Sequence, residues 1–384
     1  MLNYVVASML LLCTLLSTHA AHAVNKGDVL WEFKTDAQVW SPLASRGDLV
    51  YFGSDDGNFH ALNTRQKKET WRYHSGAAVR SGAAFYQDMV LFASDDGYLY
   101  ALNSGNGKLI WKFDLGSAGI ARNLPSNLGQ PDYDYLASSP VVDGDTVYVG
   151  SADGNLYSID VQSGRLRWKF ATAGRIRATP VLADGQVCVG SWDHFFYCLE
   201  RDSGKQQWRY DTKKVIQSSA VVSDGKIVFG GRKPALFALD AKSGKEIWIA
   251  RYADGSWVES SAVADAGMLY VGSSDSLKLS AFESATGKEI WKFNTGGWSW
   301  MTPLLADGVL YIGAISASPY YFPDVTLRSG FYAVDATSGK QLWQYQPSSL
   351  SGSFITGGVF ARPVLTADAV LVADLDGTLR ALAR

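Results

Sequence analysis

The chain has 384 residues, of which 47% are hydrophobic and 13% aromatic, and its formal net charge is −2. Its basic residues are scattered, which excludes the concentrated positive surface that nucleic-acid binding requires. After the N-terminal segment, no apolar run approaches the roughly 20 residues of a transmembrane span.

Residues 1–23 have the pattern of a secretory signal peptide. An apolar run over 2–16 leads to Ala21-His22-Ala23, an A-x-A cleavage signal. We therefore expect cleavage near Ala23 and a periplasmic or secreted protein. A retained anchor stays open, because no Lys or Arg precedes the apolar run. A lipid anchor on Cys13 is not expected, because Leu12 stands where a small residue is needed.

From residue 24 onward, the sequence repeats with a period near 40 residues. A strand–turn–strand pattern recurs eight times, at 51–62, 91–102, 148–159, 188–199, 228–239, 270–282, 311–334 and 371–382. Apolar and polar residues alternate in each copy, as in half-buried β-strands. A period of this length holds four short strands, the unit of a β-propeller blade. We expect one all-β domain over 24–384, a monomeric eight-bladed propeller of four-stranded antiparallel blades.

Seven of these copies are followed by a phrase that ends in tryptophan, with its clearest form, A-L-D-A-K-S-G-K-E-I-W, at 238–248. The tryptophan falls on the outermost strand, where a large ring can cover the seam between two blades. The glycine of the phrase supplies a positive φ at the turn. We expect a structural docking role for Trp71, Trp111, Trp168, Trp208, Trp248, Trp291 and Trp343.

The eighth copy ends at Arg384, before its own glycine and tryptophan. Near the N-terminus, Gly27 and Trp31 have the spacing of the missing half. We therefore predict that the first strand completes the last blade, with Trp31 as an eighth docking residue. Such closure removes the open sheet edges that invite aggregation.

The pattern A-x-D-x-x-T-G-K-x-x-W, nearly intact at 281–291 and 333–343, resembles the docking motif of pyrroloquinoline-quinone-type (PQQ-type) propeller repeats. The resemblance covers essentially the whole chain after residue 23, and in size and layout it is greatest to BamB-like outer-membrane assembly scaffolds. It implies the fold and leaves the function open, because quinone-dependent dehydrogenases and non-enzymatic scaffolds share this repeat.

Cys188 and Cys198 lie on the two arms of the fourth hairpin. In the third hairpin, Ser151 is expected to face Asn155, so paired residue numbers sum to 306; one 40-residue repeat later they sum to 386, which is 188 plus 198. The two cysteines should therefore face each other. In an oxidising compartment they could form a cross-strand disulfide, and two buried free thiols are the alternative. No metal site is expected, because no His pair accompanies them.

Three insertions interrupt the repeat, at 117–135, 314–329 and 347–358. With the strands of a blade named A to D from axis to rim, the D–A and B–C connections lie on one face, and all three insertions belong to these connections. Loops on a rigid scaffold often carry binding, so we assign function to this loop-rich face; the alternative is that these are tolerated surface insertions without a function. The Asp-Gly pairs at 56–57, 96–97, 153–154 and 376–377 are expected to be hairpin turns rather than calcium ligands.

The innermost strands begin on the same face, around the mouth of the central channel. Repeat alignment places there Trp40, Arg80, Arg177, Gln217, Glu259, Trp300 and Phe360, with Arg362 close by. The insertions add Arg122, Tyr133, Tyr135, Tyr320, Tyr321 and Phe322, and Trp298 precedes Trp300. Such residues suit a site for an anionic or polar group, or an anchor for a protein, and filling of the mouth is the alternative. We expect the aromatic residues to be exposed, available to a partner or to sugar rings.

Three functions are consistent with these features. The first is a non-catalytic scaffold without a cofactor, which binds an envelope protein or polymer through the loop-rich face; outer-membrane protein assembly is the role that the resemblance suggests. Its support is that the sequence has no recognisable Ser-His-Asp grouping and no His pair with metal-ligand spacing.

The second is a PQQ-dependent dehydrogenase-like oxidoreductase, for which the resemblance implies PQQ and calcium over the channel. Against it, the chain has no adjacent cysteine pair, and Glu259 is the one clear carboxylate at the mouth. The third is a carbohydrate-binding propeller that uses Trp298, Trp300, Tyr320 and Tyr321.

Overall fold

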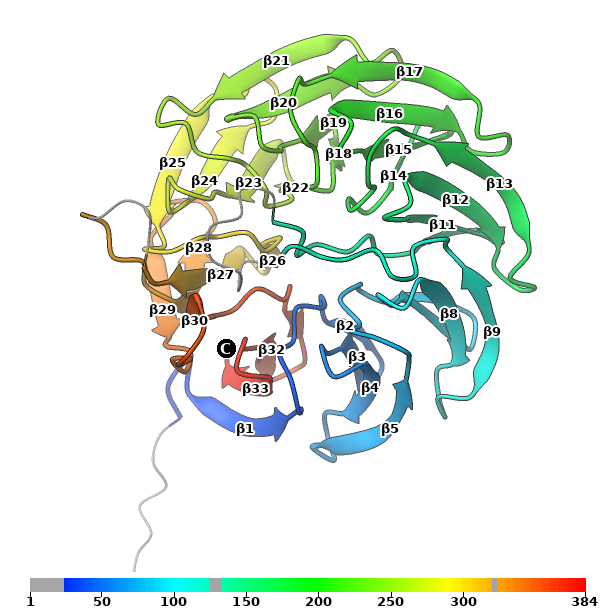
Figure 1. Ribbon diagram of the computed structural model, residues 1–384. Helices are drawn as coiled ribbons and strands as arrows, with labels where there is room; N and C mark the ends of the chain where they lie inside the picture. Colours follow the sequence, from blue (N-terminus) through cyan, green and yellow to red (C-terminus); the bar gives the residue numbers. More distant parts are fainter. Residues whose placement is uncertain (1–23, 125–132, 320–323) are drawn as a thin grey trace, which may run out of the picture.

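The computed structural model describes residues 24–124, 133–319 and 324–384. In these ranges, all the regular secondary structure consists of β-strands, and the strands form eight sheets arranged in a ring (Figure 1). The predicted eight-bladed all-β propeller is confirmed. The described ranges hold no helix that is long and apolar enough to span a membrane. The expected signal peptide, 1–23, lies outside them.

The first four blades follow the chain from the axis to the rim. They comprise β2 (Ala44–Arg46), β3 (Leu49–Gly53), β4 (Asn58–Asn63) and β5 (Lys68–His74); β6 (Ala84–Tyr86), β7 (Met89–Ala93), β8 (Tyr98–Asn103) and β9 (Leu109–Asp114); β10 (Val141–Asp143), β11 (Thr146–Gly150), β12 (Asn155–Asp160) and β13 (Leu166–Ala171); β14 (Val181–Ala183), β15 (Gln186–Gly190), β16 (Phe195–Glu200) and β17 (Gln206–Asp211).

The next three blades repeat this order, and the seventh carries a fifth strand. They comprise β18 (Val221–Ser223), β19 (Lys226–Phe229), β20 (Ala235–Asp240) and β21 (Glu246–Arg251); β22 (Val263–Asp265), β23 (Met268–Gly272), β24 (Lys278–Glu283) and β25 (Glu289–Asn294); β26 (Leu304–Ala306), β27 (Val309–Ala317), β28 (Gly330–Asp335) and β29 (Gln341–Tyr345), with β30 (Ile355–Gly358) paired to β27.

The eighth blade joins the two ends of the chain. It comprises β31 (Val364–Leu365), β32 (Ala369–Ala373), β33 (Thr378–Ala383) and β1 (Val29–Lys34), which pairs antiparallel with β33 and places Trp31 opposite Ala381. The predicted closure by the N-terminal strand is confirmed. The ring is therefore closed by a blade that combines the first strand, β1, with the last three strands of the chain.

Tryptophans and glycines lock neighbouring blades together. The indole Nε1 of Trp168 donates to the Arg201 carbonyl of the next blade over 2.8 Å, and its ring covers Gly204, where an added Cβ would lie 2.6 Å from the indole. The same pair of contacts recurs for Trp71, Trp111, Trp208, Trp248 and Trp291. Glycine is needed here both for its positive φ and for the close approach of the ring.

The two tryptophans nearest the closure differ from the others. Trp343 covers Gly27, which brings the seventh blade against the N-terminal segment. Beside Trp31 the next blade carries Lys67, at φ 55°, where other blades carry glycine, and a cavity of about 490 Å³ lies along this seam. Trp31 still packs against a buried cluster. Within the described residues, however, it does not cover a glycine of the next blade, because Lys67 stands at that position.

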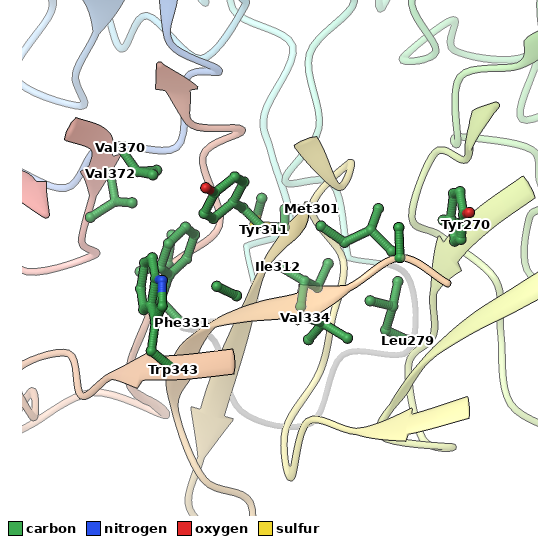
Figure 2. Packing of buried hydrophobic residues seen from close by; sticks show 14 of the residues in the cluster. Tyr270, Leu279, Met301, Tyr311, Ile312, Phe331, Val334, Trp343, Val370 and Val372 are labelled. Carbon is green, nitrogen blue, oxygen red and sulfur yellow. The ribbon is translucent and has the colours of Figure 1, made fainter. Parts of the chain in front are cut away.

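The hydrophobic core is divided among the seams between blades. Figure 2 shows one cluster, in which Tyr270 and Leu279 of the sixth blade, Phe331 and Trp343 of the seventh, and Val370 of the eighth line one continuous region. Burial of apolar surface at every seam stabilises the ring without a single central core.

In the fourth blade, Cys188 of β15 lies directly opposite Cys198 of β16. This is the register that the repeat arithmetic predicts. The two sulfurs form a disulfide, and both residues are fully buried. The structure thus adopts the disulfide rather than the free-thiol alternative.

Candidate functional site

The three insertions meet on one face. β27 extends beyond its blade to Ala317 and pairs with β30 of the third insertion, with Ile315 opposite Gly358. Trp298 forms a β-bridge with the same Ile315. A buried cluster joins Ile315 and Phe354 to Tyr135 of the first insertion. The three insertions therefore pack against one another and form one continuous surface on the loop-rich face.

The first insertion crosses the channel mouth. The described parts of the connection between β9 and β10 lie over the middle of the ring (Figure 1). Tyr135 is 1% exposed and lies among mouth residues of three blades, Trp40, Trp300 and Phe360. A segment of the chain thus occupies the place where a ligand of the channel mouth would enter.

One half of the mouth is aromatic. Tyr135 stacks on Trp300 with ring centroids 4.6 Å apart, and Trp300 stacks on Trp298 at the same separation. Phe360 meets Tyr135 edge-on at 5.4 Å, and its ring centroid lies 5.0 Å from that of Trp40. Offset and edge-to-face pairs of this kind stabilise beyond their burial alone.

The other half of the mouth is charged and centres on Asp134, which is fully buried. Its Oδ2 accepts from Arg177 Nη2 over 2.5 Å and from Arg175 Nη1 over 2.6 Å, and Oδ1 lies 3.3 Å from Arg122 Nη1. Burial, with Arg122 nearby, lowers the pKa of the Arg177 guanidinium to about 10. Three cations thus share one carboxylate, so further carboxylates are needed to balance the charge.

Two aspartates from hairpin turns supply part of that balance. Asp95 accepts from Arg122 Nε over 2.5 Å, and Asp55 accepts two bonds from Arg80, over 2.8 and 2.6 Å. Burial would raise the pKa of the Asp95 carboxyl, but Arg122 outweighs it and the pKa falls below its usual value. For Asp55, burial outweighs Arg80 and the pKa rises.

Glu259 links the charged and aromatic halves. Its carboxylate accepts from Tyr135 Oη over 2.7 Å, from Gln217 Nε2 over 2.5 Å and from Arg232 Nε over 2.8 Å. Burial and the neighbouring Glu259 charge raise the pKa of the Tyr135 hydroxyl well above its usual value, so it donates as a neutral phenol. The single mouth carboxylate noted in the sequence is therefore fully bonded.

Arg232 is held from several sides. Its guanidinium lies 5.3 Å from the ring centroid of Trp192 and 5.1 Å from that of Trp257, and its Nη2 donates to the Tyr133 carbonyl over 2.5 Å. Cation–π contacts and a carbonyl bond thus fix the cation that neutralises Glu259. The first insertion is anchored here as well, because the carbonyl belongs to it.

The structure brings the predicted mouth residues together but buries them. Exposure is 4% for Trp40, 6% for Arg80, 7% for Arg177, 0% for Gln217, 1% for Glu259, 1% for Trp298 and 4% for Trp300. The prediction that the aromatic residues are exposed is wrong for Tyr135, Trp298 and Trp300, because they stack on one another inside the mouth. Tyr320, Tyr321 and Phe322 lie outside the described residues.

The residues that the sequence did not single out are Asp55, Asp95, Asp134, Arg175 and Arg232. Only the second aspartate of each Asp-Asp-Gly turn caps the turn, as Asp56 does by accepting from the Asn58 amide over 2.9 Å. The first aspartate, Asp55 or Asp95, instead pairs with arginine. In the sequence, the signal that could have identified Asp55 and Asp95 was the pair of consecutive aspartates in each turn, because only one of the two is needed to cap the turn.

These residues do not fit a PQQ and calcium site. Glu259 is already neutralised by Arg232, and Tyr135 takes the space above Trp300. The cavity bounded by Asp95, Arg122 and Arg177 has about 30 Å³, which suits a water molecule rather than a three-ring quinone. Within the described ranges, no group of three or more His, Cys, Asp or Glu could hold a metal ion.

Comparison with known proteins places this architecture in a family. No curated protein matches the sequence. Similar solved structures include BamB from Moraxella catarrhalis, with TM-score 0.61, 17% identity and coverage of 75% of this chain and 86% of that one. They also include a europium-containing methanol dehydrogenase, with TM-score 0.67, 16% identity and coverage of 90% and 84%.

A quinohemoprotein alcohol dehydrogenase from Comamonas testosteroni has TM-score 0.67 and 14% identity, with coverage of 93% of this chain and 76% of that one. At such identities these likenesses concern the fold alone. The sequence profile described as outer membrane protein assembly factor BamB matches residues 18–191, 96–259 and 238–384. Since these segments span nearly the whole chain, the protein belongs to this family of PQQ-type β-propellers.

Proposed function

We propose that this protein is an exported, non-catalytic scaffold, which binds a protein of the cell envelope through its loop-rich face and serves outer-membrane protein assembly. The observation that carries the proposal is the sealed mouth: Tyr135 and Arg122 of the first insertion occupy it and bond to the ring around it. The face therefore offers its outer surface to a large partner rather than a funnel to a small ligand.

Rigidity of the face supports the same proposal. β27 and β30 form a two-stranded extension, and Phe354 and Leu327 anchor it to the buried aromatic cluster. A pre-organised surface loses little conformational entropy when it binds. Exposed residues on the second insertion, Val325 and Arg328, lie beside these anchors in the sequence and are available for contact.

The two alternative functions, an oxidoreductase and a carbohydrate-binding propeller, have less support than the scaffold. The oxidoreductase needs a free carboxylate and room above the channel, and Glu259 and Tyr135 are engaged with each other. The carbohydrate-binding propeller needs exposed aromatic faces, whereas Trp298 and Trp300 are covered. The proposal therefore assigns no catalytic residue, no PQQ and no calcium to this chain.

The test is complementation of cells that lack the protein. Wild-type protein, a Val325→Asp/Arg328→Glu double variant and a control, Ile247→Asp, would be expressed at equal levels. Ile247 is 46% exposed on the rim strand β21. Outer-membrane proteins in the envelope fraction should be restored by the wild type and the control, and reduced by the double variant.

Two results would refute the proposal. One is normal outer-membrane protein content in cells that lack the protein. The other is oxidation of alcohols or aldoses by the purified protein supplied with PQQ and calcium, which would favour the dehydrogenase alternative.

A further inference from the structure

Below the sealed mouth, a second ring of residues lines the channel. Each member stands two residues before the start of an innermost strand: Pro42, Gly82, Ser139, Thr179, Ser219, Ser261, Thr302 and Arg362. Except for Gly82, they are partly exposed, whereas the described residues of the mouth ring above are mostly buried. Seven of the eight side chains are small or absent, and Arg362 is the only charged member.

Hydrogen bonds connect successive members of this ring from blade to blade. The Gly82 amide donates to Ser139 Oγ over 2.8 Å, and the Ser139 amide donates to Thr179 Oγ1 over 3.0 Å. The Thr179 amide donates to Ser219 Oγ over 2.8 Å, and the Ser219 amide to Ser261 Oγ over 2.9 Å. The side chains of neighbouring blades are thereby held at one level of the channel.

In each of these bonds the hydroxyl oxygen is the acceptor. A hydroxyl can accept and also donate one hydrogen bond. Among the described residues, the hydroxyls of Ser139, Thr179, Ser219 and Ser261 donate to no acceptor. The ring therefore presents O–H donors whose oxygens are fixed in place and whose hydrogens are available.

Arg362 adds an uncompensated cation to these donors. Its Nε is buried and has no hydrogen-bond partner, and its guanidinium forms no ion pair within the part of the chain that the structure describes. Burial lowers the pKa of this guanidinium. The mouth arginines Arg80, Arg122 and Arg177 are all paired with aspartates. A partly buried, unpaired charge is costly unless a counter-ion accompanies it.

The ring is closed off on the loop-rich side. Phe360, two residues before Arg362, packs edge-on against Tyr135, and Tyr135 spans to Trp300 and Trp40. A small solute would therefore reach Arg362 from the face opposite the insertions. This feature is independent of the proposed partner surface.

We infer that the channel below Tyr135 binds a small oxyanion, a carboxylate or a phosphate, between the guanidinium of Arg362 and the hydroxyls of Ser139, Thr179, Ser219 and Ser261. A guanidinium offers two parallel N–H donors that match the oxygens of such a group. The hydroxyls supply the further donors that a desolvated anion needs, and no ring member carries a competing negative charge.

The test is calorimetric titration of the purified protein with inorganic phosphate and, separately, with acetate, at constant ionic strength set by sodium chloride. The variants are Arg362→Gln, Thr179→Val and a control, Arg65→Gln, whose side chain is 80% exposed and paired with Asp48. Loss of a charged donor is expected to weaken binding about 10- to 100-fold in Arg362→Gln. Thr179→Val should weaken it less, and Arg65→Gln should bind as the wild type does.

The two probes separate the two classes of oxyanion, because tighter binding of phosphate or of acetate identifies the class that the site prefers. Thermal unfolding without added oxyanion serves as the folding control, because Arg362→Gln should be at least as stable as the wild type once an unpaired cation is removed. Equal affinity in the wild type and Arg362→Gln, or no binding of either probe to the wild type, would overturn the inference.

Discussion

The ring of Tyr135 lies on the indole of Trp300, with centroids 4.6 Å apart and planes inclined by 15°. The two residues are 165 positions apart in the sequence, since 300 minus 135 is 165. Their contact joins the first insertion to the seventh blade, and the Tyr135 hydroxyl extends the link to Glu259 of the sixth. One side chain thus ties an insertion to two blades across the channel.

Substitution of Tyr135 is expected to separate the stack from the hydrogen bond. Tyr135→Phe keeps the ring but removes a donor to a buried carboxylate, which should lower the free energy of unfolding by about 1–3 kcal/mol. Tyr135→Ala also removes the ring and should cost about 3–5 kcal/mol. Urea unfolding followed by near-UV circular dichroism measures both. Equal losses in the two variants would show that the stack contributes nothing.

The glycines beneath the docking tryptophans should tolerate substitution worse than other turn glycines. In Gly204→Ala, a residue at φ 70° gains a Cβ that would lie 2.6 Å from the Trp168 ring. Gly185, at φ 76°, has nothing within 4 Å of its added Cβ and is the matched control. We expect losses of about 3 kcal/mol for Gly204→Ala and about 1 kcal/mol for Gly185→Ala. Similar values in urea unfolding would argue against a packing role for the glycine.

The disulfide between Cys188 and Cys198 should stabilise the fourth blade. A cross-link between residues 10 positions apart is expected to contribute about 2–3 kcal/mol, so reductant should lower the urea midpoint of the wild type. A Cys188→Ala/Cys198→Ala variant serves as the control, because its midpoint should not respond to reductant. Mass spectrometry after alkylation under denaturing conditions counts the free thiols; alkylation of both cysteines before reduction would contradict the disulfide.

Stability should depend on pH through Asp374. This buried carboxylate shares Arg380 with Asp376 and Glu32, and burial raises the pKa of Asp374 to about 7 against the opposing effect of Arg380. Its ordinary pKa is 3.8. The folded state therefore binds more protons between these two values, and the free energy of unfolding should fall by roughly 1 kcal/mol per pH unit as pH rises through that window.

Asp374→Asn is the variant that tests this dependence. An amide cannot titrate, so the slope of stability against pH should flatten between pH values of about 4 and 7. Urea unfolding of the wild type and the variant at several pH values in this window provides the measurement. An unchanged slope in Asp374→Asn would assign the dependence to other groups.

The sequence by itself determined the framework, because the signals that define it are local and repeat. A tryptophan about every 40 residues, with a glycine four positions before it, indicates the blade, its turn and its seam, and the split phrase at Gly27 and Trp31 indicates closure. The hairpins of the third and fourth blades are 40 residues apart, so the register of one carried over to Cys188 and Cys198 of the other.

Only the tertiary structure decided what fills the channel mouth. The partners of Arg177 and Glu259 are Asp134 and Tyr135, from an insertion that has no counterpart in the other blades. Repeat alignment located the mouth positions but not the path of that insertion. Burial and ion pairing depend on which side chains converge in space, so residues that looked available in the sequence are covered, and Arg362 has no ion pair among the residues that the structure describes.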